Sequence, residues 1–227
     1  MSFDRAASAL KWWSDAGVDT IVAEEPHNWL APAPAKPATA AEPEAPATMP
    51  ATLDAFQAWL AGAPFPFAPP SAPRLAPAGD PASGLMVMTG MPALGGGFFG
   101  GEADALFDRM LAAIGRGRET IYLASLSPER TPSGALDRAS ERSLAELARH
   151  HVGLVQPKAL LLFGDACARA LLGMPVTKAR GRWHALATPA GEIRTLVTIK
   201  PDNLVDQRAL KKLAWADLQM LMEELTP

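Results

Sequence analysis

The 227-residue sequence contains one cysteine, Cys167, and this scarcity excludes an intramolecular disulfide bond. One thiolate also cannot supply the ligand set of a structural zinc ion or an iron–sulfur cluster. We therefore expect no metal and no cofactor. We interpret Cys167 as a small buried residue on a helix, which is the usual environment of a free cysteine.

The sequence also lacks any run of 18 or more apolar residues, so it predicts no membrane-spanning helix. Its first residues, Met-Ser-Phe-Asp-Arg, do not show the charged-then-apolar pattern of a secretory signal. We expect a cytoplasmic protein of bacterial type that has no membrane partner and is a monomer.

Basic residues are few overall, with 21 Lys and Arg against 24 Asp and Glu, but their distribution is uneven. Residues 1–83 hold 4 basic and 9 acidic residues, whereas residues 84–227 hold 17 and 15. Cations crowd near the end of the second part. Such clustering is the electrostatic footprint of phosphate contacts, and it is equally typical of a solvated helix face.

Composition divides the chain into three parts. Residues 1–30 form an N-terminal segment in which apolar positions at helical spacing predict a helix over 2–16. Residues 31–50 contain six prolines and almost no large apolar side chain, which predicts a semi-stiff linker outside the core. Residues 51–227 are predicted to form one domain, and the N-terminal arm is a candidate contact for a protein partner.

Short apolar runs alternate with helical periods in the third part, after a helix predicted over 52–61. The runs of strand length are 85–90, 120–127, 159–164 and 195–200, and the helical patterns cover 102–115, 136–155, 165–173 and 206–225. Strands separated by such helices predict right-handed crossovers. The expected fold class is therefore α/β, a three-layer αβα arrangement with a central four-stranded parallel sheet.

Three other patterns carry less information. The glycines at 95–97 and 100–101 are not followed by the residues of a phosphate-binding loop, so nucleotide binding is not the preferred interpretation. His150 and His151 are neighbours on a predicted helix and point in different directions, which makes them a poor metal pair. The alternation of Met86, Met88 and Met91 is typical of core packing on a strand.

Four segments near the C-terminus carry a family resemblance: Ala159-Leu-Leu-Leu-Phe-Gly164, Ala170-Leu-Leu-Gly173, Lys178-Ala-Arg-Gly-Arg-Trp-His184 and Val197-Thr-Ile-Lys-Pro-Asp-Asn-Leu204. In this order and spacing they resemble the uracil-DNA glycosylase superfamily, especially its iron–sulfur-dependent prokaryotic branch. The resemblance extends over roughly 1–30 and 52–227, and it implies a uracil-DNA glycosylase-like fold and a DNA partner, single- or double-stranded.

The resemblance also assigns roles after the first strand. The family has a Gly-Glu-Ala-Pro-Gly turn whose carboxylate helps to place the attacking water, and this chain has Met88-Thr-Gly-Met-Pro-Ala93 there. Gly90 thus occupies the catalytic acid position, while Met91 and Pro92 fall in the substrate-binding turn. Phe99 matches the family phenylalanine that stacks on the extruded base.

After the second strand, the resemblance places Ser125 where the family has the asparagine that reads the base. A hydroxyl makes fewer hydrogen bonds than an amide, which weakens base discrimination. Glu129 stands in the place of a cluster cysteine, and the remaining cluster cysteines have no counterpart. The resemblance therefore does not extend to the metal cluster.

After the fourth strand, Lys200 stands where the family has a histidine that stabilises negative charge on the departing base. A lysine could supply a cation for the same task, although it is more hydrated and more flexible than an imidazole. The resemblance assigns DNA contacts to Pro201, Asn203, Arg180 and Arg182. Further on, Lys211, Trp215, Asp217 and Leu218 match a family helix.

Three functions remain open from the sequence. The first is a divergent base-excision enzyme that flips a base into a pocket around Phe99, Ser125 and Lys200 and hydrolyses an N-glycosidic bond, with weak or lost uracil excision. The second is a catalytically inactive DNA-binding or protein-interaction module on the same fold. The third is an unrelated small-molecule α/β enzyme.

Overall fold

The computed structural model describes residues 8, 12, 49–62 and 74–225 of the chain. The predicted linker over 31–50 lies almost wholly outside this part, as does the N-terminal helix except for Ser8 and Trp12. The division of the chain at residues 30 and 50 therefore stays a prediction. No helix in the described residues is long and apolar enough to cross a membrane.

The described domain is built on one six-stranded sheet. Its strands are β1 (Ala78–Gly79), β2 (Leu85–Thr89), β3 (Tyr122–Ser125), β4 (Ala159–Phe163), β5 (Trp183–Thr188) and β6 (Gly191–Thr198). Their spatial order is β1-β3-β2-β4-β6-β5, and the four inner strands β3, β2, β4 and β6 run parallel. This confirms the predicted α/β fold with its parallel sheet, to which two antiparallel edge strands are added.

The two central strands β2 and β4 are mostly apolar, and helices cover both of their faces. Every residue of β2 and β4 is buried, as is typical of parallel sheets. The strand connections are helical: α3 (Gly101–Ala113), α4 (Arg138–Val155), and α5 (Gly164–Leu172) with α6 (Val176–Ala179).

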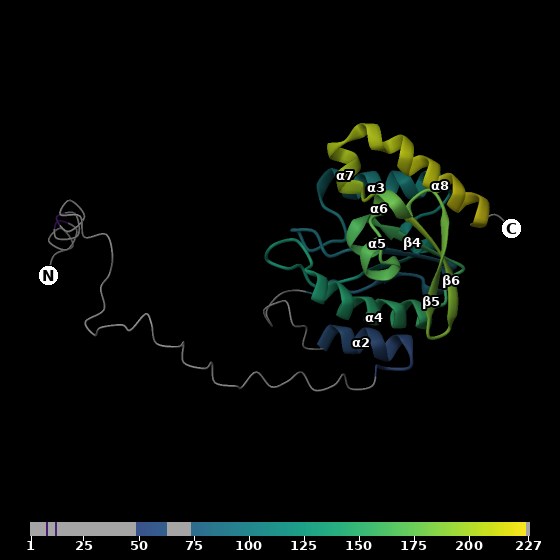
Figure 1. The fold of residues 1–227 in the computed structure, drawn as a ribbon, viewed down its shortest axis with the longest axis horizontal. Helices are drawn as coiled ribbons and strands as arrows, with labels where there is room; N and C mark the ends of the chain where they lie inside the picture. The colour runs from purple at the N-terminus through teal and green to yellow at the C-terminus, as the bar shows by residue number, and fades with distance from the viewer. Residues whose placement is uncertain (1–7, 9–11, 13–48, 63–73, 226–227) are drawn as a thin grey trace. The chain divides into compact units, whose positions relative to one another are not determined.

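Two apolar cores lie on opposite faces of the sheet. On one face α3 packs with α7 (Pro201–Asp206) and α8 (Lys211–Leu225), and on the other face α4, α5 and α6 pack (Figure 1). The outer helix α2 (Leu53–Gly62) lies against α4, and its Phe56 is fully buried. The domain therefore has the three layers expected from the sequence, with α2 as an extra outer layer.

The sequence pattern did not predict the edge strand β5. It pairs with β6 through a hairpin whose turn is Pro189-Ala190, and only Leu186 of the strand is buried. The strand sequence Trp-His-Ala-Leu-Ala-Thr lacks a clear apolar alternation, so the pairing with β6 defines β5. The helix predicted over 206–225 also differs, since α7 and a 3₁₀ turn (Arg208–Leu210) precede α8.

Candidate functional site

The parallel strands all end at one edge of the sheet, and the residues singled out in the sequence follow those ends. Thr89 of β2 pairs in register with Ser125 of β3, and Phe163 of β4 pairs with Thr198 of β6. Because all four strands run in the same direction, the segments that follow them emerge together. This carboxyl edge is the usual ligand site of open α/β sheets, and we call it the carboxyl-edge site.

Gly90 begins the turn after β2 and brings no functional side chain to this site. Its carbonyl accepts a hydrogen bond from the Ser127 N–H at 2.9 Å, which joins the turns after β2 and β3. A Cβ atom at Gly90 would lie 3.3 Å from the Cβ of Ala166 on α5, a tight approach. A larger residue here would require α5 to give way, so the turn is packed around the glycine.

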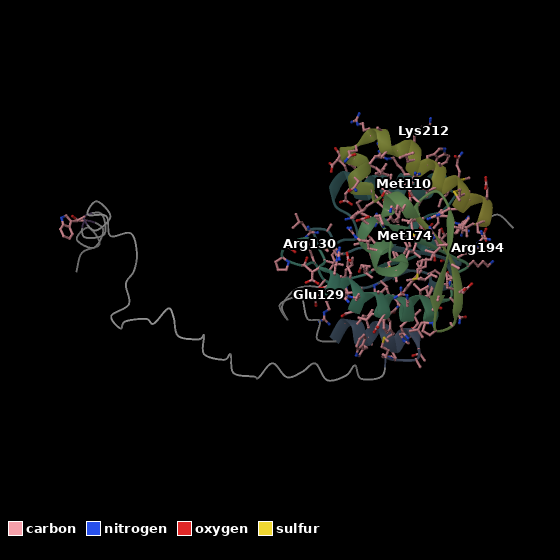
Figure 2. The ribbon with its side chains drawn as sticks, viewed as in Figure 1. Met110, Glu129, Arg130, Met174, Arg194 and Lys212 are labelled. Carbon is pink, nitrogen blue, oxygen red and sulfur yellow. The ribbon has the colours of Figure 1, made fainter. Side chains whose placement is uncertain are left out.

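Met91 and Pro92 continue this turn, and both are buried. The Pro92 carbonyl accepts a hydrogen bond from Arg130 Nη1 at 3.0 Å. Arg130 comes from the loop after β3, which also carries the neighbouring Glu129 (Figure 2). The turn is thus held to the next loop along the edge, and Met91 and Pro92 form part of its packed wall.

Phe99 lies just before α3 and is 3% exposed. Its ring centroid is 4.7 Å from that of Phe107 and 5.8 Å from that of Phe163, the last residue of β4. The phenylalanine proposed to stack on a base therefore belongs to a buried aromatic cluster. A base could reach this ring only after the segment before α3 moves.

Ser125 is partly exposed and lines a cavity of about 20 Å³ between β3, α2 and α4. Phe56 and His151 also line it. A cavity of this size holds about one water molecule, so it is too small for a base.

Lys200 lies two residues after the end of β6 and immediately before the first residue of α7. Its ammonium group lies 3.2 Å from Asp202 Oδ2, and a quarter of its side chain is exposed. A Cβ atom at Gly164 would lie 3.4 Å from the Cβ of Lys200, so the ends of β4 and β6 approach closely. The structure thus places one lysine cation at the carboxyl edge, with a carboxylate beside it.

Cys167 lies on α5 just behind the carboxyl edge and is fully buried, as predicted. Burial raises the pKa of its thiol to about 12, although the nearby Lys200 acts in the opposite direction. The thiol donates to the Met88 carbonyl at 3.6 Å. At neutral pH it is therefore a protonated packing residue and not a nucleophile.

Glu129, which stands in the place of a cluster cysteine, is 3% exposed and forms an ion pair with Arg74. Arg74 also donates to the Leu60 carbonyl at 2.9 Å. This pair joins the loop after β3 to the segment before β1. The described residues contain no group of three or more His, Cys, Asp or Glu side chains that could hold a metal ion, and the expectation of a metal-free protein stays a prediction.

The residues assigned to DNA contacts fall into different environments. Arg182 and Asn203 are exposed, whereas Pro201 is buried as the first residue of α7. The Arg182 guanidinium donates to the Lys178 carbonyl at 3.1 Å. Arg180 is largely buried, because its guanidinium contacts Asp217 of α8. Arg182 and Asn203 are therefore the members of this group most accessible to a phosphate.

Three features of this region were not found from the sequence. Thr89 is fully buried, and its hydroxyl has no hydrogen-bond partner in the part of the chain that the structure describes. Tyr122 and His151 form a buried hydrogen bond of 2.8 Å. Asp217 is fully buried and accepts from several donors. The sequence did not show the burial or the partners of these side chains, because the partners of Tyr122, His151 and Asp217 lie 19 to 37 residues away.

The fold is that of an α/β domain, and its carboxyl-edge site is formed by the segments that follow the parallel strands. The sequence model of the uracil DNA glycosylase superfamily matches residues 76–219, which is more than half of the chain and includes all six strands of the sheet. The chain belongs to this superfamily. A search of curated proteins finds no match.

Proposed function

We propose that this chain binds DNA at the carboxyl-edge site and is a divergent base-excision glycosylase in which uracil excision is weak or lost. Superfamily membership supports a glycosylase-like fold. The observation that carries the proposal is the position of Lys200, a cation at the carboxyl end of β6 beside the end of β4. The family resemblance assigns the charge-stabilising residue to this point.

The proposed reaction is hydrolysis of the N-glycosidic bond of a flipped base. The bond between the sugar and the base breaks, and the electron pair leaves with the base. Water supplies the hydroxyl group that the sugar gains, and the proton released from that water ends on the departing base. The Lys200 ammonium group would stabilise the negative charge that develops on the base. Asp202 lies 3.2 Å from that ammonium group and partly offsets its field.

Three further features support weak or absent uracil excision. Gly90 supplies no carboxylate to place the attacking water, and Ser125 offers one hydroxyl in place of an amide. In addition, Phe99 is enclosed by Phe107 and Phe163. Before a base could stack on this ring, the aromatic cluster would have to open, at the cost of buried contacts.

The same closed aromatic cluster favours a second candidate, a catalytically inactive DNA-binding module. In that case the exposed Arg182 and Asn203 would contact phosphates, and no base would enter the site. Salt would weaken such binding, because phosphate contacts release counterions.

The cytoplasmic location, the bacterial origin, the monomeric state and a protein partner for the N-terminal arm stay predictions.

One experiment separates the two candidates. The full chain is incubated with single- and double-stranded oligonucleotides containing uracil, hypoxanthine or xanthine, and alkali then reveals abasic sites. A divergent enzyme cuts at some lesion and loses this activity in Lys200→Ala, because the lost charge acts mainly on the developing anion. An inactive module cuts none but binds DNA in a salt-dependent manner. Absence of both cleavage and binding refutes both candidates.

A further inference from the structure

A separate groove is lined by residues of α3 and α8, with Leu204 of α7. These helices belong to the same layer, on one face of the sheet (Figure 1). Its volume is about 290 Å³. Leu106 and Met110 of α3 and Leu218 of α8 line it, and each of these three side chains is less than 10% exposed. The groove therefore opens onto the edge of the apolar core and is large enough to admit a bulky side chain.

The rim of the groove is cationic. Arg109 of α3 and Lys211 of α8 line it and are exposed, and no ion pair joins either of them to another residue in the described ranges. Trp215 also lines the groove and is 41% exposed. Lys212, next to Lys211, is labelled on the same helix in Figure 2, as is Met110 on α3. All charged side chains that line the groove are thus positive.

The composition of the lining argues against a nucleobase and against a second copy of this chain as the occupant of the groove. A nucleobase has donors and acceptors around its edge, and burying them without partners is costly. Apart from the indole N–H of Trp215, the lining offers no uncharged polar side chain to pair with that edge. In a symmetric dimer through this face the same patch would meet its own copy, so the Arg109 and Lys211 rims would repel each other.

We propose that this groove binds an acidic segment of a partner protein. The segment inserts one large apolar side chain over Met110 and beside Trp215, and its carboxylates lie against Arg109 and Lys211. Complementary charge at the rim favours acidic partners over others, while the apolar floor and the exposed tryptophan supply the contact area. This site is independent of the carboxyl-edge site and of the proposed glycosylase function.

The test uses a fluorescein-labelled decapeptide of alternating Asp and Ser with one central Phe, and the full chain. We expect saturable binding in fluorescence anisotropy, which is lost when the peptide's Phe is replaced by Ser or its Asp residues by Lys. Arg109→Glu and Lys211→Glu should each weaken binding about five-fold or more, because each reverses an attractive charge. Lys158→Glu, an exposed charge reversal before β4, should have no effect.

A second variant separates lost contact from lost folding. Trp215→Ser removes the wall of the groove at a partly exposed position, so it should abolish peptide binding without changing the circular dichroism spectrum. The proposal is overturned if the peptide does not bind at millimolar concentration, or if the Lys158 variant loses binding equally. It is also overturned if an oligonucleotide displaces the peptide, or if the protein dimerises through this face in sedimentation.

The same variants keep the two proposals distinguishable. Lys200→Ala should retain peptide binding, and Lys211→Glu should retain any cleavage of lesion-containing DNA. A protein that binds the peptide but neither cleaves nor binds DNA supports the groove and refutes the glycosylase proposal. The opposite pattern refutes the groove alone.

Discussion

Arg180 and Asp217 form an ion pair that joins the segment after α6 to α8. Arg180 Nη2 lies 3.0 Å from Asp217 Oδ1, and Arg180 Nε lies 3.2 Å from Oδ2. The Gly181 N–H and the Thr198 hydroxyl also donate to this carboxylate, at 3.1 and 2.8 Å. Burial raises the pKa of Asp217, while these donors oppose the rise. Arg180 is therefore held by the fold, and this largely buried pairing leaves it less available to phosphate than Arg182.

The arginine pair gives the first prediction. Arg180→Ala leaves the buried Asp217 carboxylate without its cation, and removing one partner of a buried pair destabilises a protein by about 3–5 kcal/mol. Arg182→Ala removes an exposed side chain and should change the free energy of unfolding by less than about 0.5 kcal/mol. Urea denaturation measures both values.

DNA binding should show the reverse order for these two arginines. At a temperature where both variants are folded, Arg182→Ala should weaken DNA binding and reduce its salt dependence, whereas Arg180→Ala should leave the salt dependence unchanged. Equal losses of DNA affinity in the two variants would contradict the assignment of Arg180 to the fold.

Two buried threonines give the second prediction. The Thr89 hydroxyl has no hydrogen-bond partner among the described residues, and an unpaired buried polar group costs about 1–3 kcal/mol. Thr89→Val should therefore raise the free energy of unfolding by about 1 kcal/mol. Thr198→Val is the matched control, because it removes a donor to Asp217 and should lower stability by about 1–3 kcal/mol. Thermal unfolding of both variants checks the signs.

The third prediction concerns His151, which lies on α4 and is buried against Phe56 of α2. Gln57 donates to the Tyr122 hydroxyl at 2.7 Å, and this hydroxyl lies 2.8 Å from His151 Nε2. Because the Tyr122 hydroxyl oxygen already accepts a hydrogen bond from Gln57, we infer that the hydroxyl donates its proton to the hydrogen bond with His151 and that His151 Nε2 is the acceptor. Burial, with a smaller contribution from His150, lowers the pKa of His151 to about 4.

Over a range of pH, His151 is therefore neutral in the folded state and protonated in the unfolded chain. Between about pH 6.5 and pH 4 the unfolded state carries the extra proton, so stability rises with pH by about 1.4 kcal/mol per unit from this group. Above about pH 6.5 the contribution is constant. His151→Gln keeps a polar partner for Tyr122 and cannot titrate, so the difference between variant and wild-type curves isolates the effect. Parallel curves over this range would contradict the prediction.

The fourth prediction concerns the cation at the carboxyl edge. Asp202 lies 3.2 Å from Lys200 Nζ and reduces the positive potential there. If the protein excises a base, Asp202→Asn should raise the rate of the chemical step several-fold, because it removes a negative charge close to the leaving group. Single-turnover kinetics on a lesion-containing oligonucleotide measures this rate. A slower step in the Asp202→Asn variant would show that the Asp202 carboxylate holds Lys200 in a required position.

The sequence by itself determined the sheet and its strand direction. The apolar runs at 85–90, 159–164 and 195–200 were long enough to be strands and were separated by helical periods, so a parallel sheet covered on both faces was the consistent solution. The motif order also determined the superfamily. Both results depend on patterns that are local in the chain.

Only the tertiary structure decided how individual side chains are used. The family resemblance assigned Arg180 to a DNA contact, but its guanidinium is paired with Asp217, which lies 37 positions away in the sequence. Phe99 was assigned to base stacking, and Phe163 of β4 encloses it. The edge strand β5 and the groove between α3 and α8 likewise exist only through packing. Burial and pairing depend on contacts between distant segments, which no local pattern encodes.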